Sequence, residues 1–179
     1  MRFEDARNYK KQIKHLYRTA FPSNERAPLP LLFHRSDNGR DSFFAVLDND
    51  EFIGLVYTIQ TEKMLYVFFL AVTEDKRGKG YGSKIIHIIK KMYPEKVITL
   101  LIEDTTDKNA DNLSQRLNRL KFYESNDFKQ LNIKINEAGV NYELLGTATT
   151  ITKNDFLALM KDYLGIVLFK IIYRKNYLK

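Results

Sequence analysis

The run Met64–Val72 constrains the fold of this chain more than any other stretch. It reads Met-Leu-Tyr-Val-Phe-Phe-Leu-Ala-Val and contains no charged residue. A strand that is apolar on both faces must be covered on both sides, so this run predicts a central strand in a sheet with helices on its faces. A loop rich in glycine and basic residues follows directly, and an amphipathic pattern begins at Tyr81.

The loop after this strand predicts a binding site for an anion. The apolar positions 81, 85, 88, 89 and 92 predict a helix whose N-terminus points out of the edge of the sheet. Backbone N–H groups at a helix start lack acceptors and lie at the positive end of the helix dipole. The loop supplies glycines for close approach and cations for charge: Gly78, Gly80, Gly82, Arg77, Lys79 and Lys84. Together these features predict a cradle for a phosphate or another oxyanion.

Other interpretations of the glycines fit less well. A P-loop needs Gly-Lys followed by Ser or Thr, whereas here Lys79 precedes Gly80. The dinucleotide fingerprint needs a glycine where this chain has Ser83. A turn with solvated lysines is the purely structural alternative.

Periodicity and turn residues predict an α/β fold of the α+β type, in which a mixed sheet carries helices on its faces. The predicted helices cover 4–20, 29–34, 81–92, 110–123 and 154–164, and the predicted strands cover 42–47, 51–61, 64–72, 97–102, 128–135 and 141–149. Asp48-Asn49-Asp50 and Glu137-Ala138-Gly139 are the expected hairpin turns, and Thr152 or Asn154 is the expected cap of the last helix. We expect a single domain over 1–179, with a core of about 4–149 and a C-terminal helix and apolar tail over 150–179.

Composition narrows the possible functions. The absence of cysteine excludes disulfides, thiolate nucleophiles and Cys-based metal sites, and the three histidines lie too far apart for a metal motif, so no metal is expected. No signal peptide or membrane-spanning run is visible, which predicts a cytoplasmic protein without a membrane partner. The formal charge of +7 favours an anionic partner, but Lys and Arg are interleaved with acids, so no nucleic-acid partner is expected.

The glycine loop resembles a known family signature. Arg77-Gly78-Lys79-Gly80-Tyr81-Gly82 is similar to the Arg/Gln-x-x-Gly-x-Gly/Ala motif of the GNAT acetyltransferase superfamily, and Leu70-Ala71-Val72 is similar to the strand end that precedes it. The resemblance implies a mostly antiparallel central sheet and acetyl-coenzyme A (CoA) as cosubstrate. It assigns Leu70, Ala71 and Val72 to the pantetheine arm, and it assigns Arg77, Gly78, Lys79, Gly80, Tyr81, Gly82 and Ser83 to the pyrophosphate.

A second segment supports this resemblance. Phe122-Tyr123-Glu124-Ser125-Asn126-Asp127-Phe128 resembles the Leu-Tyr-x-x-x-Gly-Phe motif of the same family, with Asp127 in place of the glycine. The match implies that Tyr123 is the general acid that protonates the departing thiolate. A phenol suits this role because its pKa of about 10 keeps it protonated at neutral pH. Arg116 stands where the family often has Asn, and Arg116 and Arg119 either reach a CoA phosphate or form a solvated face.

The general base is the weakest part of the prediction. Relatives often carry a glutamate on the central strand, and Met64–Val72 has none. We predict Glu103, which follows the strand at 97–102, as the catalytic base. Glu25 is a less favoured candidate, and either carboxylate instead holds a cationic substrate or caps a loop.

These residues predict an N-acetyltransferase that moves an acetyl group from acetyl-CoA to a primary amine of a small molecule or peptide. Direct attack in a ternary complex is expected, because no cysteine is present to form an acyl-enzyme. The alternative is a catalytically inactive CoA-binding sensor or interaction module. The apolar segment Leu164–Tyr173 either packs on its own sheet or forms a homodimer, and we favour the homodimer.

Overall fold

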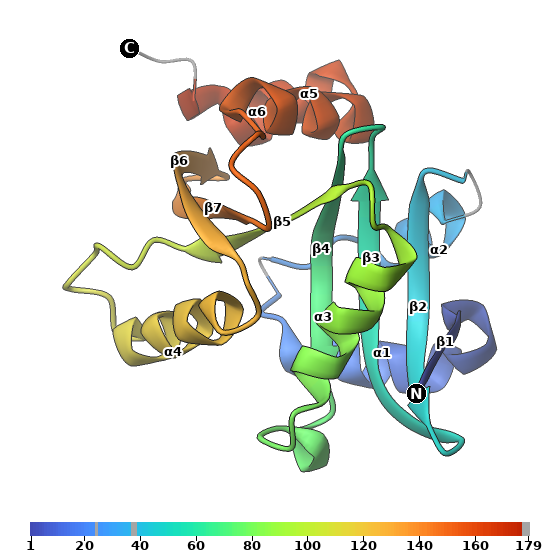
Figure 1. Cartoon of the computed structure of the whole chain (residues 1–179). Helices are drawn as coiled ribbons and strands as arrows, with labels where there is room; N and C mark the ends of the chain where they lie inside the picture. Colours follow the sequence, from blue (N-terminus) through green and yellow to red (C-terminus); the bar gives the residue numbers. More distant parts are fainter. Residues whose placement is uncertain (24, 37–38, 177–179) are drawn as a thin grey trace. The chain divides into compact units, whose positions relative to one another are not determined.

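The computed structural model describes residues 1–23, 25–36 and 39–176. The end of the predicted tail and parts of the loops at 22–28 and 36–41 therefore lie outside the described residues. The chain forms two compact units, one of residues 1–60 with 66–94 and the other of residues 61–65 with 95–179. The described residues contain seven strands and six α-helices (Figure 1). The predicted α/β class with a mostly antiparallel sheet is confirmed.

The first unit is built on four neighbouring strands. They follow one another in space as in the sequence: β1 (Arg2–Asp5), β2 (Asp41–Asp48), β3 (Glu51–Gln60) and β4 (Met64–Val72). β2 pairs antiparallel with both β1 and β3. The turn between β2 and β3 places Asn49 and Asp50 at φ angles of 48° and 64°, which match the twist of a tight hairpin.

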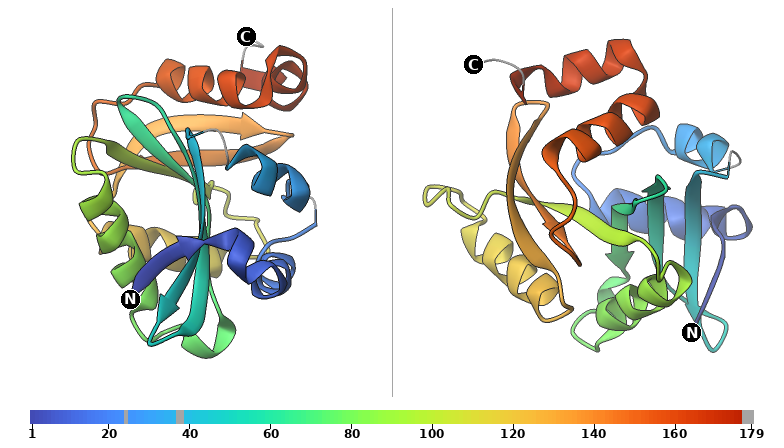
Figure 2. Two further views of the ribbon diagram at one scale, coloured as in Figure 1. Left: turned by 90° about the vertical axis from the view of Figure 1, so that its right-hand side faces the viewer. Right: turned by 45° about the horizontal axis from the view of Figure 1, so that its top comes forward.

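Helices cover both faces of these strands. α1 (Lys10–Ala20) and α2 (Leu29–Arg35) lie on one face, and α3 (Tyr81–Met92) lies on the other (Figure 2). α1 buries Ile13, Leu16 and Tyr17, whereas α3 buries Ile85, Ile86 and Ile89. This two-sided cover explains why β4 can be apolar on both faces.

The N-terminal segment corrects one prediction. The helix expected over 4–20 begins only at Lys10, because Arg2–Asp5 is a strand and Ala6–Tyr9 is a 3-10 turn. Phe3 lies opposite Val46 in the sheet, and its ring is 5.4 Å from that of Phe44. Strand pairing with β2 therefore overrides the local helical pattern.

The second unit has a smaller antiparallel group of strands. β5 (Val97–Glu103), β7 (Val140–Gly146) and β6 (Lys129–Glu137) are neighbours in that order. α4 (Leu113–Glu124) contacts β5, while α5 (Lys153–Leu164) and α6 (Ile166–Tyr173) contact β6. Thr152 caps α5 as predicted: its hydroxyl accepts the N–H of Asp155 at 3.2 Å, and its own N–H donates to the Asp155 carboxylate at 2.9 Å.

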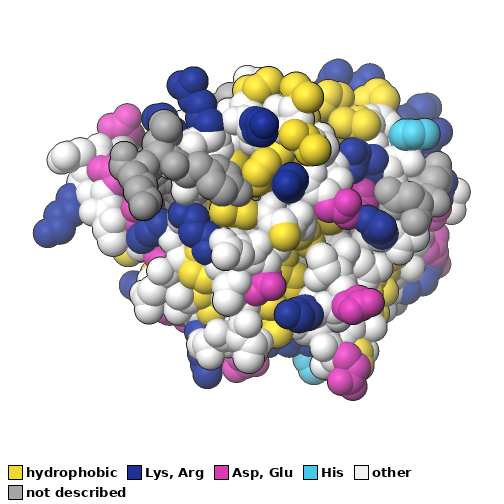
Figure 3. Space-filling model, turned by 90° about the horizontal axis from the view of Figure 1, so that it is seen from above, with side chains coloured by type: hydrophobic (Ala, Val, Ile, Leu, Met, Phe, Trp, Pro, Cys, Tyr) yellow, Lys and Arg dark blue, Asp and Glu magenta, His cyan; other side chains and the backbone are white. Residues whose placement is uncertain are grey.

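The apolar C-terminal segment forms α6 and is covered on one side only. Phe169 and Tyr173 are buried, and the Tyr173 hydroxyl donates to Glu137 Oε2 at 2.7 Å. Ile166, Val167 and Ile171 remain 58%, 76% and 65% exposed. Figure 3 looks down on α5 and α6 and shows hydrophobic side chains with Lys and Arg among them. Within the described residues, no helix has both the length and the apolar character needed to cross a membrane.

Candidate active site

The start of α3 leaves backbone donors without helical partners. The first bond into the helix runs from the Lys84 N–H to the Gly80 carbonyl at 3.1 Å. The N–H groups of Tyr81, Gly82 and Ser83 therefore have no intrahelical acceptor. Gly80, the N-cap, has no side chain that could accept them. These three donors can bind the oxygens of an anion.

The glycines keep the approach to these donors open. Gly78 and Gly80 have φ angles of 70° and 78°, which L side chains rarely adopt. A Cβ at either position would meet no atom within 4 Å, so the space above the loop is free. The residues present thus fit the pyrophosphate of CoA, which needs close backbone approach and several N–H donors.

Side chains around the loop fix its shape and add charge. The Arg77 Nε donates to the Val72 carbonyl at 3.2 Å and ties the loop to the end of β4. The Tyr81 hydroxyl donates to Asp48 Oδ2 at 3.2 Å, and this bond raises the pKa of Tyr81. Lys84 places its ammonium 5.0 Å from the centre of the Tyr81 ring. Lys79 is exposed and makes no ion pair with any carboxylate in the described part of the chain.

The strand end before the loop is held by a close backbone contact. A Cβ on Gly54 would lie 2.3 Å from the Ala71 carbonyl oxygen, so β3 can approach β4 here only with glycine at this position. The Thr73 N–H donates to the Ile53 carbonyl at 2.9 Å. Leu70 and Val72 are half-buried, whereas Ala71 is buried.

Tyr123 lies near the end of α4 in the second unit. Its ring packs against those of Phe122 and Phe128, with centroids 5.1 Å and 5.6 Å away. Its hydroxyl makes no hydrogen bond to any described residue. Burial raises the pKa of Tyr123 and outweighs the opposing positive charge of Arg119. The phenol is therefore protonated at neutral pH and available as a proton donor.

The turn after Tyr123 keeps its shape although Asp127 replaces a glycine. Asp127 has a φ angle of 63°, the left-handed conformation that glycine favours and that Asp tolerates. The Phe128 N–H donates to the Tyr123 carbonyl at 3.1 Å and closes the turn.

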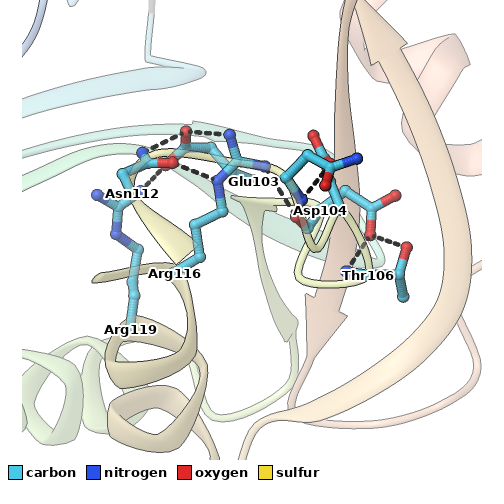
Figure 4. A network of polar contacts seen from close by, with 8 residues as sticks. Glu103, Asp104, Thr106, Asn112, Arg116 and Arg119 are labelled. Atoms are coloured by element: carbon cyan, nitrogen blue, oxygen red, sulfur yellow. Dashed lines mark hydrogen bonds and ion pairs between the residues drawn. The ribbon is translucent and has the colours of Figure 1, made fainter. Parts of the chain in front are cut away.

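Glu103, the predicted base, ends β5 and is already bound by three side chains (Figure 4). Asn112 Nδ2 donates to its Oε1 at 3.0 Å, and Arg116 lies 3.2 Å from the same oxygen. Arg119 lies 3.2 Å from Oε2. The Glu103 side chain is 14% exposed. To accept a proton, this carboxylate would have to give up part of its contact with two guanidinium groups.

The Arg116 side chain, like that of Glu103, is already bound by several neighbouring groups. Besides Glu103, its guanidinium donates to Asn112 Oδ1 at 2.7 Å and to the Asp104 carbonyl at 2.8 Å. Its side chain is 14% exposed, whereas that of Arg119 is 47% exposed. The contact of Arg116 with a CoA phosphate stays a prediction, and Arg119 has the freer side chain of the two.

A second ionic group adjoins this network. Asp104 accepts hydrogen bonds from Lys134 Nζ at 2.8 Å and from the Thr106 N–H and hydroxyl at 2.9 Å and 2.7 Å. Burial alone would raise the pKa of Asp104, but these donors outweigh it and lower the pKa to about 2. Lys134 also lies 3.3 Å from the buried Glu143.

The predicted site residues thus fall into two sets. Residues 70–72 and 77–83 lie together in the first unit, whereas Glu103, Arg116 and Tyr123 lie in the second. Glu25, the less favoured base, is an exposed residue in the loop between α1 and α2. Sequence reasoning missed the bond from Asn112 to Glu103, since no local spacing relates a residue before α4 to the end of β5.

Comparison with known proteins agrees with this geometry. The model of the acetyltransferase (GNAT) family matches residues 10–128. The match spans more than half of the chain, so this protein belongs to the GNAT acetyltransferase family. Among curated proteins no sequence match was found.

Solved structures share the fold at low sequence identity. A protein assigned to the GNAT acetyltransferases from Bacteroides thetaiotaomicron is 18% identical, with a TM-score of 0.77 over 94% of this chain and 99% of its own. An aminoglycoside 6'-N-acetyltransferase complexed with coenzyme A is 16% identical, with a TM-score of 0.64 over 85% of this chain and 99% of its own. Arabidopsis thaliana Naa50 with the bisubstrate analogue CoA-Ac-MVNAL is 17% identical, with a TM-score of 0.62 over 82% of this chain and 97% of its own.

Proposed function

We propose that this protein is an N-acetyltransferase that transfers an acetyl group from acetyl-CoA to a primary amine of a small molecule or peptide. The observation that carries the proposal is the open cradle at the start of α3, where three backbone N–H groups have no intrahelical acceptor and two preceding glycines have positive φ angles. Solved structures of the same fold include acetyltransferases bound to coenzyme A and to a CoA–peptide analogue, which supports both cosubstrate and acceptor class.

The proposed roles follow from the chemistry of each group. The amides of Tyr81, Gly82 and Ser83, together with Lys79, hold the pyrophosphate, and the backbone of Leu70–Val72 pairs with the pantetheine arm. A neutral amine attacks the thioester carbonyl carbon, and the carbon–sulfur bond then breaks. Tyr123 gives its proton to the departing thiolate, and the proton from the amine nitrogen passes to a base or to water.

Glu103 is proposed as this base in spite of its three partners. In that role its carboxylate would accept the proton of the amine nitrogen directly or through a water chain, and the Glu103→Gln variant would lose most of its turnover. The engagement of Glu103 by two arginines favours the alternative of a CoA-binding module without catalysis. In that case Glu103 only stabilises the junction of α4 and β5.

Turnover measurements test this proposal directly. Release of free CoA thiol from acetyl-CoA would be followed with a panel of primary amines. A reaction that contains the protein but no added amine is the control. Amine-dependent thiol release supports the enzyme. Thermal stabilisation by CoA without turnover on any amine would support the module instead, because ligand binding to the folded state alone raises its stability.

We also propose that the exposed face of α6, formed by Ile166, Val167 and Ile171, pairs with a second copy of the chain. The support is the size of these exposed side chains on a helix whose other face is buried. Light scattering on the full chain and on Val167→Asp tests this. A dimer that becomes a monomer on substitution is expected, and a monomeric full chain would contradict the proposal.

A further inference from the structure

A hollow between α1 and α2 in the first unit has basic walls. Its volume is about 450 Å³, within the range of small-molecule sites. Its lining includes Lys14, Arg18, Arg26, Tyr17 and Phe33, and we call it the basic hollow. Phe33, Leu29 and Pro30 supply apolar surface, so the hollow combines an apolar wall with three cations.

Within the described part of the chain, the three cations have no ion-pair partner. Lys14, Arg18 and Arg26 make no ion pair with any carboxylate in residues 1–23, 25–36 and 39–176. Lys14 and Arg18 are one turn apart on α1, where two like charges disfavour the helix. Arg26 is half-buried, which removes part of its hydration without supplying a counter-ion. An anion in the basic hollow would offset all three effects.

The hollow is connected to the strand end proposed for the acyl donor. The Tyr17 hydroxyl donates to the Ala27 carbonyl at 3.1 Å, which ties α1 to the loop that carries Arg26. The edge of the Tyr17 ring meets Phe69 on β4, with centroids 5.0 Å apart. Phe69 directly precedes Leu70–Val72, the stretch assigned to the pantetheine arm. Tyr17 thus links the wall of the basic hollow to the strand that would hold the thioester, with the Tyr17 ring between the hollow and β4.

We propose that the basic hollow binds the acetyl acceptor by an anionic group, so that the preferred acceptors are amines that carry a carboxylate. This inference rests on the proposed acetyltransfer function. Arg26 and Arg18 hold the carboxylate, and Phe33 covers the apolar part of the acceptor. An amine without the anion would supply no counter-ion to these three cations.

Matched acceptors test the charge requirement. Phenylalanine, phenylalaninamide and the phosphonate analogue of phenylalanine present the same side chain with a carboxylate, a neutral amide or a phosphonate. We expect kcat/KM for the carboxylate to exceed that for the amide by roughly ten-fold or more, since charge-assisted hydrogen bonds are lost with the amide. Equal values of kcat/KM for the carboxylate and the amide would overturn the proposal. A preference for the phosphonate would assign the hollow to phosphorylated amines instead of carboxylates.

Substitutions in the basic hollow test which residues bind the carboxylate of the acceptor. Arg26→Gln and Arg18→Gln are each expected to raise KM for the carboxylate several-fold with little change in kcat, and to leave the KM for the amide unchanged. Lys11→Gln, an exposed position of α1 that does not line the hollow, is the matched control. Arg18 is exposed, so its variant is expected to fold even if Arg26→Gln does not. An unchanged preference in Arg18→Gln and Arg26→Gln would contradict the assignment of these residues.

The test of the basic hollow can be distinguished from the test of the proposed acetyltransfer activity. Calorimetric binding of phenylalanine to the CoA-loaded protein, with and without the Arg18→Gln change, reports on the hollow even where no turnover occurs. Turnover on neutral amines alone would support the proposed acetyltransferase activity and contradict the proposed preference for anionic acceptors. If phenylalanine binding is lost in Arg18→Gln and no amine is turned over, the result would support the anion site and contradict the proposed acetyltransferase activity.

Discussion

The polar groups that form the candidate sites differ between the two units of this molecule in whether they have partners. In the first unit, the amides at the start of α3 lack helical acceptors, and Lys14, Arg18 and Arg26 lack ion-pair partners among the described residues. In the second unit, Glu103 and Asp104 accept bonds from Asn112, Arg116, Arg119, Lys134 and Thr106. Groups that the fold leaves unpaired are available to ligands, whereas groups that pair with one another hold the fold together.

The largest effect is expected at the unpaired amides. Gly80→Val should abolish the thermal stabilisation by CoA, because the branched side chain would fill the open space above the loop. Gly139→Val is the matched control, since Gly139 also has a positive φ, of 94°, but lies in the turn between β6 and β7. Both variants should lose stability in the absence of ligand, and only Gly80→Val should lose the response to CoA. If CoA still stabilises Gly80→Val against heat, the start of α3 is not part of the CoA-binding site.

Tyr123 is the exception in the second unit, because its hydroxyl has no partner among the described residues. Tyr123→Phe should lower kcat by roughly ten- to a thousand-fold with CoA binding unchanged, as the loss of one proton-transfer group predicts. Rate measurements under saturating substrates, together with thermal shifts by CoA, would separate the two effects. Full turnover in this variant would mean that another group protonates the thiolate.

The paired arginines should differ in their contribution to stability. Arg116→Ala removes a largely buried ion pair to Glu103 together with the bonds to Asn112 and the Asp104 carbonyl, and about 2 kcal/mol of unfolding free energy should be lost. Arg119→Ala removes a half-exposed ion pair and should cost about 0.5 kcal/mol. Chemical denaturation measures both values. If only Arg119→Ala weakens CoA binding, Arg119 and not Arg116 contacts the cofactor, whereas equal costs in stability would refute the distinction.

A further small effect concerns the dependence of stability on pH. The pKa of Asp104 is lowered from 3.8 to about 2, so the stability from its ion pair is present above its unfolded pKa and is lost as the pH falls from about 4 to about 2. Because Lys134 is 47% exposed, solvent screening should hold this contribution to about 1 kcal/mol or less. Denaturation of wild type and Asp104→Asn across this range should give curves that converge at low pH. Curves that stay parallel would show that the pKa of Asp104 is not lowered by folding.

The sequence by itself determined the elements around the cradle. The apolar run of β4, the glycine loop and the register of α3 were predicted correctly because each depends on local periodicity and on the conformational freedom of glycine. The α/β class and the GNAT family followed from the same segment, whereas the site roles assigned to its residues stay predictions. The hairpin turn at Asn49 and Asp50 and the cap at Thr152 were also local enough to predict.

Tertiary structure decided what depends on partners that are distant in the sequence. Arg2–Asp5 became a strand because β2 offered it an open edge, against a pattern that favoured a helix. Glu103 came to be held by residues of α4 and the loop before it, which no local spacing indicated. Arg26 joined Lys14 and Arg18 in one hollow because the Tyr17 hydroxyl bonds the loop back to α1. A local pattern fixes where a side chain points from its own helix or strand, but only the packed fold decides which charges meet a partner and which remain open to a ligand.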